Sequence, residues 1–287
     1  MEVNSTTWIW RTVGSVSAAA TLLLLFGFIS AINTIVNPSS GGAALAPDQK
    51  TAPSANPVGG ADEASEIRVA AIGDSLAKGT GDDTGNGFVR RTVQILNEQE
   101  GRSARLINNL GINGLTTEGL LTKLDEPGTS YVLKEANLIM LSIGGNDLFA
   151  GVQATEGTGV PPTAEQLRAV LPAAQERVAQ VLEKLHTINP NAKVVYLGLY
   201  NPFGDLKEYQ VPGNAVVAEW NQSILALMSK HQNMVLIPSF DLFQQNLQSY
   251  LSSDHFHPNG DGYQAIAERV AQGYGPAPLS KKEEAQP

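Results

Sequence analysis

The chain of 287 residues contains no cysteine. This absence excludes disulfide bonds, a thiolate nucleophile, cysteine-ligated zinc and iron–sulfur clusters. Basic residues are also scarce, because 19 lysine and arginine residues stand against 28 aspartate and glutamate residues, for a formal net charge of -9. A nucleic-acid-binding protein needs basic side chains to neutralise phosphates, so we expect no nucleic-acid partner. The chain is long enough to bury a hydrophobic core without a metal or a disulfide.

Charge is missing altogether between Arg11 and Asp48. Within this stretch, Val13–Val36 is mostly apolar, and as a helix it would extend about 36 Å, more than the ~30 Å hydrocarbon core of a bilayer. We therefore predict that residues 1–37 form an N-terminal membrane anchor. A cleaved signal peptide and a buried core helix are the alternatives, and Ala44–Ala46 offers a small-residue cleavage site.

The few basic residues around this run give its orientation. Arg11 is the only basic residue before it, and Lys50 is the first one after it. The positive-inside rule then places the N-terminus in the cytoplasm and the rest of the chain outside. We predict a single-pass protein of the cell membrane with an extracytoplasmic domain, which becomes a secreted protein if the N-terminal segment is cleaved. Residues 38–66, rich in Pro, Gly, Ala and Ser, are predicted to be a flexible linker, and residues 276–287 a disordered tail.

Between the linker and the tail, residues 67–275 alternate short apolar runs with amphipathic segments. Runs typical of strands are Ile67–Ile72, Ala104–Leu110, Asn137–Ile143, Lys193–Leu199 and Met234–Ile237. Segments with helical spacing are Phe88–Gln99, Thr116–Leu124, Ala164–Thr187 (kinked or restarted at Pro172), Ala215–Lys230, Asp241–Gln248 and Asp261–Gln272. Strands separated by helices predict an α/β fold with a mainly parallel sheet and helices on both of its faces.

In such sheets the chemistry lies at the carboxyl ends of the strands. The first three runs are followed by Gly73–Leu76 (GDSL), Gly111–Gly114 (GING) and Gly144–Asp147 (GGND). A serine beside a tight glycine turn can be a nucleophile, and glycine N–H groups with an asparagine amide can hold an oxyanion. Taken singly, each segment also fits an ordinary turn, or a loop that caps the next helix.

A fourth segment near the end of the chain contains Asp254, His255 and His257. An aspartate and a histidine three residues apart suit a pair in which the carboxylate orients the imidazole and the imidazole acts as a base. Asp254 and His257 have this spacing. A metal site made of the two histidines and Asp254 is the alternative. It is disfavoured because a histidine pair two residues apart lacks a convincing third ligand, and because metal chemistry would leave Ser75 without a role.

Together the four segments resemble those of the SGNH/GDSL hydrolase family, which includes lysophospholipase-, thioesterase- and arylesterase-like enzymes and carbohydrate deacetylases. Gly73–Leu76 is similar to the first block of the family, Asn109–Thr116 to the second, Gly144–Asp147 to the third and Asp254–His257 to the last. The resemblance covers about residues 67–275. It implies a flavodoxin-like three-layer α/β/α sandwich with about five mainly parallel strands.

The resemblance also implies roles for individual residues. Ser75 would be the nucleophile, His257 the general base and Asp254 its orienting carboxylate. The oxyanion would be held by the N–H groups of Ser75 and Gly114 and by the side-chain amide of Asn146. Gly111 competes with Gly114 for its role, Asp74 is expected to be structural and Asp147 to be a cap or a supporting residue. Neither a metal nor an organic cofactor is implied.

The implied function is serine-dependent hydrolysis of carboxylic esters of the lipase, lysophospholipase or esterase kind, with a lipid or acylated glycan as substrate at a membrane surface. One alternative is an O-acetyl esterase that acts on carbohydrate or cell-wall polymers. Two others are a non-catalytic binding domain on the same fold and an acyltransferase with the same serine chemistry. Ala150–Thr163 is expected to line the acyl pocket or to be a plain surface loop, and Tyr200–Phe203 to form an aromatic wall or part of the core.

Overall fold

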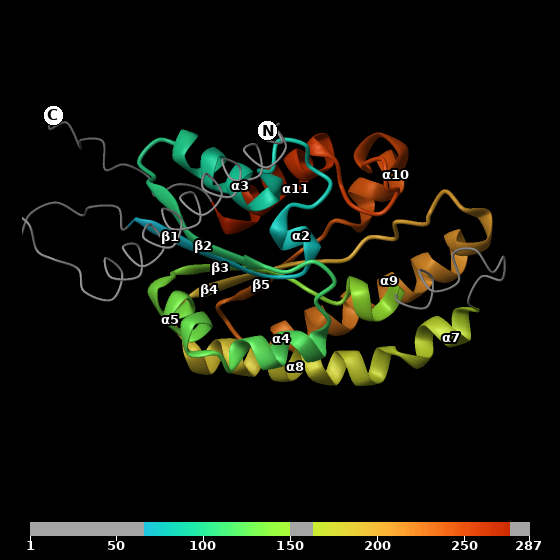
Figure 1. Cartoon of the computed structure of the whole chain (residues 1–287), viewed down its shortest axis with the longest axis horizontal. Coiled ribbons are helices and arrows are strands. Elements are labelled where there is room, and N and C mark those ends of the chain that lie inside the picture. Colours follow the sequence, from blue (N-terminus) through green and yellow to red (C-terminus); the bar gives the residue numbers. More distant parts are fainter. Residues whose placement is uncertain (1–65, 150–162, 276–287) are drawn as a thin grey trace, which may run out of the picture. The chain divides into compact units, whose positions relative to one another are not determined.

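A computed structural model describes residues 66–149 and 163–275 (Figure 1). The predicted N-terminal anchor, almost all of the predicted linker, the predicted tail and nearly all of the Ala150–Thr163 loop lie outside these residues. Among the helices that are described, none has both the length and the apolar character that a membrane span needs.

Five strands form one sheet, and every pair of neighbouring strands is parallel. They are β1 (Ile67–Gly73), β2 (Ala104–Gly111), β3 (Leu138–Ser142), β4 (Lys193–Leu197) and β5 (Met234–Ile237). The strand order is β2-β1-β3-β4-β5, which is the flavodoxin-like order. The five predicted strands are therefore confirmed, with ends that shift by one or two residues.

Helices cover both faces of this sheet and make three layers (Figure 1). One face carries α2 (Ser75–Lys78), α3 (Gly87–Glu98), α10 (Phe240–Tyr250) and α11 (Gly260–Tyr274). The other face carries α4 (Thr117–Leu124), α5 (Pro127–Glu135), α7 (Ala164–Ala169), α8 (Leu171–Ile188) and α9 (Lys207–Met228). The predicted three-layer α/β/α sandwich is confirmed.

The core has two parts because side chains alternate across each strand. In β1, Ala70 and Ile72 pack against the layer that contains α8 and α9, whereas Val69 and Ala71 pack against the layer that contains α3 and α11. All four are fully buried. A strand covered on both faces reads as a continuous apolar run, which is why the strands were recognisable in the sequence.

The short helix α2 was not predicted, and the longer helices differ from the prediction in three places. The segment Ala164–Thr187 is two helices, because α7 ends at Ala169 and Pro172 lies in the first turn of α8, where a missing N–H costs nothing. Helix α9 begins at Lys207, before the predicted start at Ala215, and contains Pro212. Helix α5 was not predicted, since its sequence (PGTSYVLKE) is short and only weakly amphipathic.

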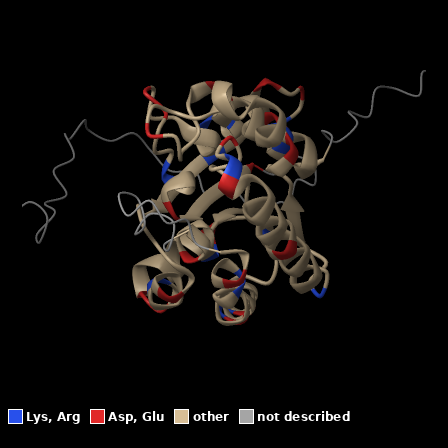
Figure 2. Cartoon of the chain, turned by 90° about the vertical axis from the view of Figure 1, so that its right-hand side faces the viewer, with Lys and Arg blue, Asp and Glu red and all other residues tan. Residues whose placement is uncertain are grey.

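Charged residues of both signs occur in the helices of both outer layers (Figure 2). The sheet itself is mostly uncharged in this view. In the view of Figure 2, Lys and Arg residues of the described part do not cluster into a basic patch. This agrees with the excess of acidic residues in the sequence.

Candidate active site

The register of the sheet brings three of the sequence segments together. Gly73, the last residue of β1, is paired with Gly111 at the end of β2 and with Ser142 at the end of β3. The segments that follow these strands therefore start side by side at one edge of the sheet, as the sequence predicted.

Ser75 is the first residue of the short helix α2, directly after the turn that leaves β1. The turn requires glycine at position 73, because its φ is +137° and an added Cβ would lie 1.8 Å from the carbonyl oxygen of Ser142. Asp74 then caps α2 by accepting a hydrogen bond from the N–H of Leu76 at 3.0 Å. This tight turn fixes the position of the Ser75 side chain, which is 4% exposed as a whole residue.

Asp74 also ties this turn to β3. Its carboxylate accepts a hydrogen bond from Ser142 Oγ, and that hydroxyl accepts one from the N–H of Ala77 at 3.0 Å. Burial raises the pKa of Asp74 from 3.8 to about 6, against the opposing effect of hydrogen bonds from Ser142 and Leu76. The contacts of Asp74 all lie within the scaffold, in agreement with the structural role expected for it.

The fourth sequence segment meets Ser75 from the other side. His257 Nε2 lies 2.7 Å from Ser75 Oγ, and His257 Nδ1 lies 2.7 Å from Asp254 Oδ2. Three of the predicted site residues thus form one hydrogen-bonded chain. This order of groups suits transfer of the serine proton to the imidazole, with the carboxylate holding the ring in the required tautomer.

The turn that carries His257 is held by its own short-range hydrogen bonds. Asp254 Oδ1 accepts hydrogen bonds from Ser252 Oγ at 2.8 Å and from the N–H groups of Phe256 and His257, both at 2.9 Å. Burial would raise the pKa of Asp254, but the hydrogen bonds from His257, Phe256 and Ser252 outweigh it and hold the pKa well below its usual range. Asp254 therefore stays ionised at neutral pH. His255, at the tip of the turn, has a φ of +53°.

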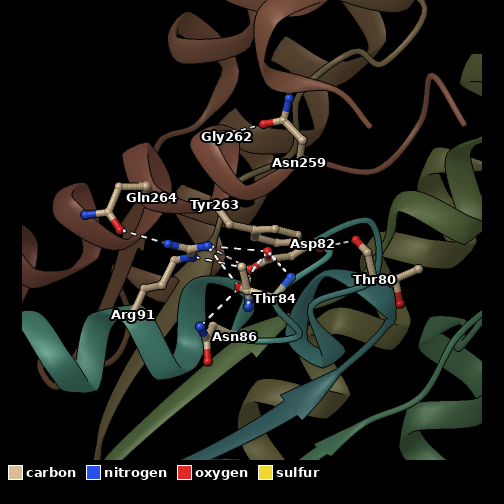
Figure 3. A network of polar contacts seen from close by, with 10 residues as sticks. Thr80, Asp82, Thr84, Asn86, Arg91, Asn259, Gly262, Tyr263 and Gln264 are labelled. Carbon is tan, nitrogen blue, oxygen red and sulfur yellow. Dashed lines mark hydrogen bonds and ion pairs between the residues drawn. The ribbon is translucent and has the colours of Figure 1, made fainter. Parts of the chain in front are cut away.

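A polar network supports this turn from the loop that follows α2 (Figure 3). Asp82 accepts hydrogen bonds from Thr84, from the N–H of Gly87 and from Arg91, whose guanidinium also donates to Gln264 of α11. The network holds the loop against the start of α11, just after His257. The sequence interpretation did not identify Asp82 or Arg91, although the D-x-T spacing at residues 82–84 is typical of a side-chain turn.

Close packing sets the distance between that loop and the His257 turn. An added Cβ on Gly81 would lie 2.8 Å from His257 Cβ and 2.6 Å from the carbonyl oxygen of Pro258. Tyr263 of α11 donates a hydrogen bond to the carbonyl of Thr80 at 2.8 Å. These contacts fix the imidazole beside Ser75.

The two glycines that compete in the second segment differ in their N–H groups. The N–H of Gly111 donates to Asn109 Oδ1 at 3.0 Å, and an added Cβ would lie 2.4 Å from the backbone nitrogen of Lys78. Gly111 therefore allows close packing against α2. The N–H of Gly114 makes no hydrogen bond within the described part of the chain, and its φ is +74°. Of the two, Gly114 has the donor that is open to a ligand.

Asn146 connects the second segment to the pocket beside Ser75. Its Nδ2 donates one hydrogen bond to the carbonyl of Leu115 at 2.9 Å, and the residue lines the same pocket as Ser75. The amide has a second hydrogen on Nδ2, which this contact leaves unused. Asn146 is thus oriented by the second segment, with one donor left for an oxyanion.

Asp147 supports the start of α4, whose N-cap is Thr116. It accepts hydrogen bonds from the N–H of Thr117 at 2.9 Å and from Thr117 Oγ1 at 2.7 Å, and it pairs with Arg177 of α8 at 3.1 Å. The residue joins the third segment to two helices. It therefore supports the position of Asn146 next to it.

A small apolar pocket opens next to Ser75. Its cavity volume is about 20 Å³, and Phe149, Leu199, Tyr200, Pro202 and Phe256 are among the residues that line it. Tyr200 and Pro202 belong to the segment expected to form an aromatic wall or part of the core. Both line this pocket, while Tyr200 and Phe203 are also buried core residues. Tyr200 also donates a hydrogen bond to the carbonyl of Phe256 at 2.7 Å, which anchors the His257 turn to β4.

No group of three or more His, Asp or Glu side chains within residues 66–149 and 163–275 is arranged to hold a metal ion. The two ring nitrogens of His257 are engaged by Ser75 and Asp254, so the alternative of a metal site at the His255–His257 pair finds no support in the geometry.

Known proteins share these features. A sequence model of the GDSL-like lipase/acylhydrolase family matches residues 71–265. YpmR, an uncharacterized protein of Bacillus subtilis, is 30% identical over 212 residues, which are 72% of this chain and 80% of YpmR. The spore germination lipase LipC of Bacillus licheniformis is 29% identical over 218 residues, which are 73% of this chain and 97% of LipC. The crystal structure of the lipase Lip_vut3 from a goat rumen metagenome superposes with a TM-score of 0.64 at 28% identity and covers 74% of this chain and 100% of its own.

Proposed function

Because this chain belongs to the GDSL-like lipase/acylhydrolase family, we propose that it hydrolyses carboxylic esters with Ser75 as its nucleophile. The observation that carries the proposal is the hydrogen-bonded chain from Ser75 through His257 to Asp254, which opens onto an apolar pocket. A buried serine in contact with an oriented imidazole is the arrangement that activates a hydroxyl for attack on an acyl carbon.

The reaction proceeds in two halves. Ser75 Oγ forms a bond to the acyl carbon while its proton passes to His257 Nε2, and the tetrahedral intermediate expels the alcohol, which takes that proton. Water then attacks the acyl-serine, gives a proton to His257 and releases the acid, with the proton returning to Ser75 Oγ. Asp254 stabilises the imidazolium in both halves.

Three donors stabilise the negative oxygen of each intermediate in this proposal. They are the N–H groups of Ser75 and Gly114 and the second Nδ2 hydrogen of Asn146. Support comes from the open N–H of Gly114 and from the contact between Asn146 and Leu115. The loss of one such donor costs roughly 10²–10³ in kcat.

The acyl group occupies the apolar pocket. Its aromatic and aliphatic lining favours an apolar acyl group, as in a lipase- or esterase-like substrate. LipC and Lip_vut3 are both lipases, which favours the same kind of substrate. We further propose that the enzyme works on the outer face of a membrane, on the basis of the long uncharged run at residues 13–36.

The proposal is tested with the full chain and its Ser75→Ala variant. Hydrolysis of p-nitrophenyl acetate, butyrate and a long-chain ester is measured, together with labelling by a fluorophosphonate. We expect both turnover and labelling to vanish in the variant while its circular dichroism spectrum is unchanged. Equal turnover by the two proteins would refute Ser75 as nucleophile, and a folded wild type that neither turns over nor labels would indicate a binding domain.

The same assay separates the remaining alternatives. A rate that rises from acetate to butyrate supports the acyl pocket, whereas a strict preference for acetate indicates an O-acetyl esterase. Addition of an alcohol acceptor detects acyl transfer, because a new ester would then accumulate in place of free acid.

A further inference from the structure

The surface beside His257 contains two further hollows that continue from the apolar pocket. The first is a trough lined in part by Asp205, Leu206 and Asp254–Phe256, and it shares Pro202 and Phe256 with the apolar pocket. The second is a pocket of about 170 Å³ that shares Asp205 with the trough. The trough therefore borders the apolar pocket at Pro202 and Phe256, and it borders the second pocket at Asp205.

The chemistry of ester cleavage indicates which part of the substrate lies in the trough. His257 donates a proton to the leaving oxygen, so the alcohol must lie on the His257 side of the acyl carbon. The trough is lined by the three residues that precede His257 in the chain. The part of the alcohol beyond the leaving oxygen therefore extends along the trough and toward the second pocket.

The second pocket is lined by four side-chain amides and one carboxylate above an apolar floor. The amides belong to Asn201, Gln210, Asn214 and Gln244, and we call this hollow the amide pocket. The floor includes Phe243, which is fully buried. Amides and a carboxylate satisfy hydroxyl groups as donors and acceptors, and an aromatic floor suits the C–H faces of the same ligand.

Two of these amides are held in a defined orientation. Asn201 is 5% exposed. Its Nδ2 donates to Asn214 Oδ1 at 2.9 Å and to the carbonyl of Tyr209 at 3.3 Å, and its Oδ1 accepts from the N–H of Phe203 at 3.1 Å, so Asn201 holds Asn214 in place. The oxygen of Asn214 is thereby turned to Asn201, so its Nδ2 is the donor left for a ligand. The site is built before any ligand arrives.

The other polar groups of the amide pocket have no partner of their own. Within the described part of the chain, the side chains of Asp205, Gln210 and Gln244 are exposed and make no hydrogen bond or ion pair. They offer acceptors and donors at the rim of the pocket. A ligand with several hydroxyl groups would replace the water that hydrates them.

Charge restricts the ligand further. Among the described residues that line the trough and the amide pocket there is no Lys or Arg, whereas Asp205 and Asp254 are acidic. An anionic group such as a phosphate would be repelled there. The volume of the amide pocket, about 170 Å³, corresponds to about five or six water molecules at ~30 Å³ each. A small polyol fits into this space.

We propose that the amide pocket binds the alcohol part of the ester substrate, and that this alcohol is an uncharged polyol such as a glycerol or sugar unit. The inference rests on the proposed function, because it extends the same active site. It selects glycerol esters and acylated sugars over simple alkyl esters and over esters with a phosphate-bearing alcohol.

The test compares esters that share one acyl group. The ratio of kcat/KM for glyceryl monobutyrate to that for ethyl butyrate is measured with the full chain. We expect the ratio to exceed ten in the wild type and to fall roughly 2- to 10-fold in Gln244→Ala, the size of one neutral hydrogen bond. Gln245→Ala is the matched control, because Gln245 is the next residue on α10 and does not line the pocket. The control should leave the ratio unchanged.

A second pair of variants tests the charge. We expect the wild type to cleave butyryl glycerophosphate several-fold more slowly than glyceryl monobutyrate. Asp205→Asn should narrow this difference, while Glu208→Gln, an exposed acidic residue outside the pocket, should not. Glucose 6-butyrate is measured in the same assay. A higher kcat/KM for it than for glyceryl monobutyrate indicates a sugar unit as the alcohol, and a lower one indicates a glycerol unit.

The outcomes separate this inference from the proposed function. Equal kcat/KM for glyceryl monobutyrate and ethyl butyrate, with no effect of Gln244→Ala on their ratio, would overturn the polyol site and leave ester hydrolysis intact. Absence of turnover with every ester would overturn the proposed function itself.

Discussion

The two ends of the Ser75–His257–Asp254 chain are built in different ways. Ser75 is buried, and the turn before it is fixed by contacts with β3, which lies far away in the sequence. Asp254 has a side chain that is 46% exposed, and its partners all lie within residues 252–257. The serine end therefore depends on the sheet. At the histidine end the hydrogen bonds of Asp254 stay within its own turn, although the turn also packs against Gly81 and is anchored by Tyr200.

This difference predicts how stability and activity are linked at each end. A change in the His257 turn should remove activity and leave most of the fold intact. A change around the serine turn should cost stability and activity together, because the same contacts hold the sheet. The following variants test the distinction, from the largest expected effect to the smallest.

The first variant is His257→Ala, which removes the base without touching the core. We expect kcat for a p-nitrophenyl ester to fall at least ~10⁴-fold, as in other enzymes that lose the base of such a group. The melting temperature should fall by no more than about 5 °C, because Asp254 keeps its other hydrogen bonds to the turn. Stopped assays and thermal unfolding on the same protein sample give both numbers.

His255→Asn provides the control for this variant. Position 255 has a φ of +53°, which asparagine tolerates well, and its side chain forms no part of the proposed chain. We expect kcat to stay within about 2-fold of the wild type. A loss as large as that in His257→Ala would mean that the whole turn, and not the imidazole of His257, carries the effect.

The second variant, Gly144→Ala, addresses the serine end. Its φ is +111°, and an added Cβ would lie 2.2 Å from the ring of Trp220, which donates to Tyr196 Oη while Tyr196 donates to the carbonyl of Ile143. The combined strain and overpacking should lower stability by about 3 kcal/mol and the melting temperature by roughly 10 °C. Displacement of Asn146 should also lower kcat about 10²-fold.

Gly128→Ala is the matched glycine substitution. Gly128 lies in the first turn of α5, and an added Cβ there meets nothing within 4 Å. We expect unchanged kcat and a gain of about 0.5–1 kcal/mol, since alanine restricts the unfolded chain. If Gly144→Ala lost activity with no loss of stability, the contrast between the two ends would be wrong.

The sequence predicted the parts of the fold that follow from strand burial and local turns. The five strands are continuous apolar runs, and Asp254 and His257 are close in the chain, so both could be recognised. Helix α5 and the early start of α9 could not, because α5 is short and the Pro212–Gly213 pair is typical of a helix end. In the structure Gly213 packs against the side chain of Asn201, a contact that no local pattern reveals.

The site divides in the same way into parts that local sequence reveals and parts that it does not. Segments of four to eight residues were enough to predict Ser75, Gly114, Asn146, Asp254 and His257 as site residues. The support around them was not, because it joins positions distant in the sequence: Asp74 with Ser142, Asp147 with Arg177, and Arg91 with Gln264. The amide pocket escaped for the same reason, since its lining comes from α9, α10 and the segment between β4 and α9.

The third variant, Asp74→Asn, gives the pH dependence of the serine end. The carboxyl of Asp74 has a pKa of about 6 in the folded protein, raised by burial, against 3.8 as its ordinary value. Between these values the folded protein binds more protons than the unfolded chain, so the contribution of Asp74 to stability falls as pH rises through this window. The total change is up to about 3 kcal/mol.

Asparagine keeps an oxygen acceptor for Leu76 and Ser142 but does not titrate. The melting temperature of the wild type minus that of Asp74→Asn should therefore decrease by roughly 5–10 °C between pH 4 and pH 7. The subtraction removes the other carboxyl groups, which titrate in both proteins. A difference that stays constant with pH would show that Asp74 carries the same charge in the folded and unfolded states, and the serine end would then owe less to burial than its contacts indicate.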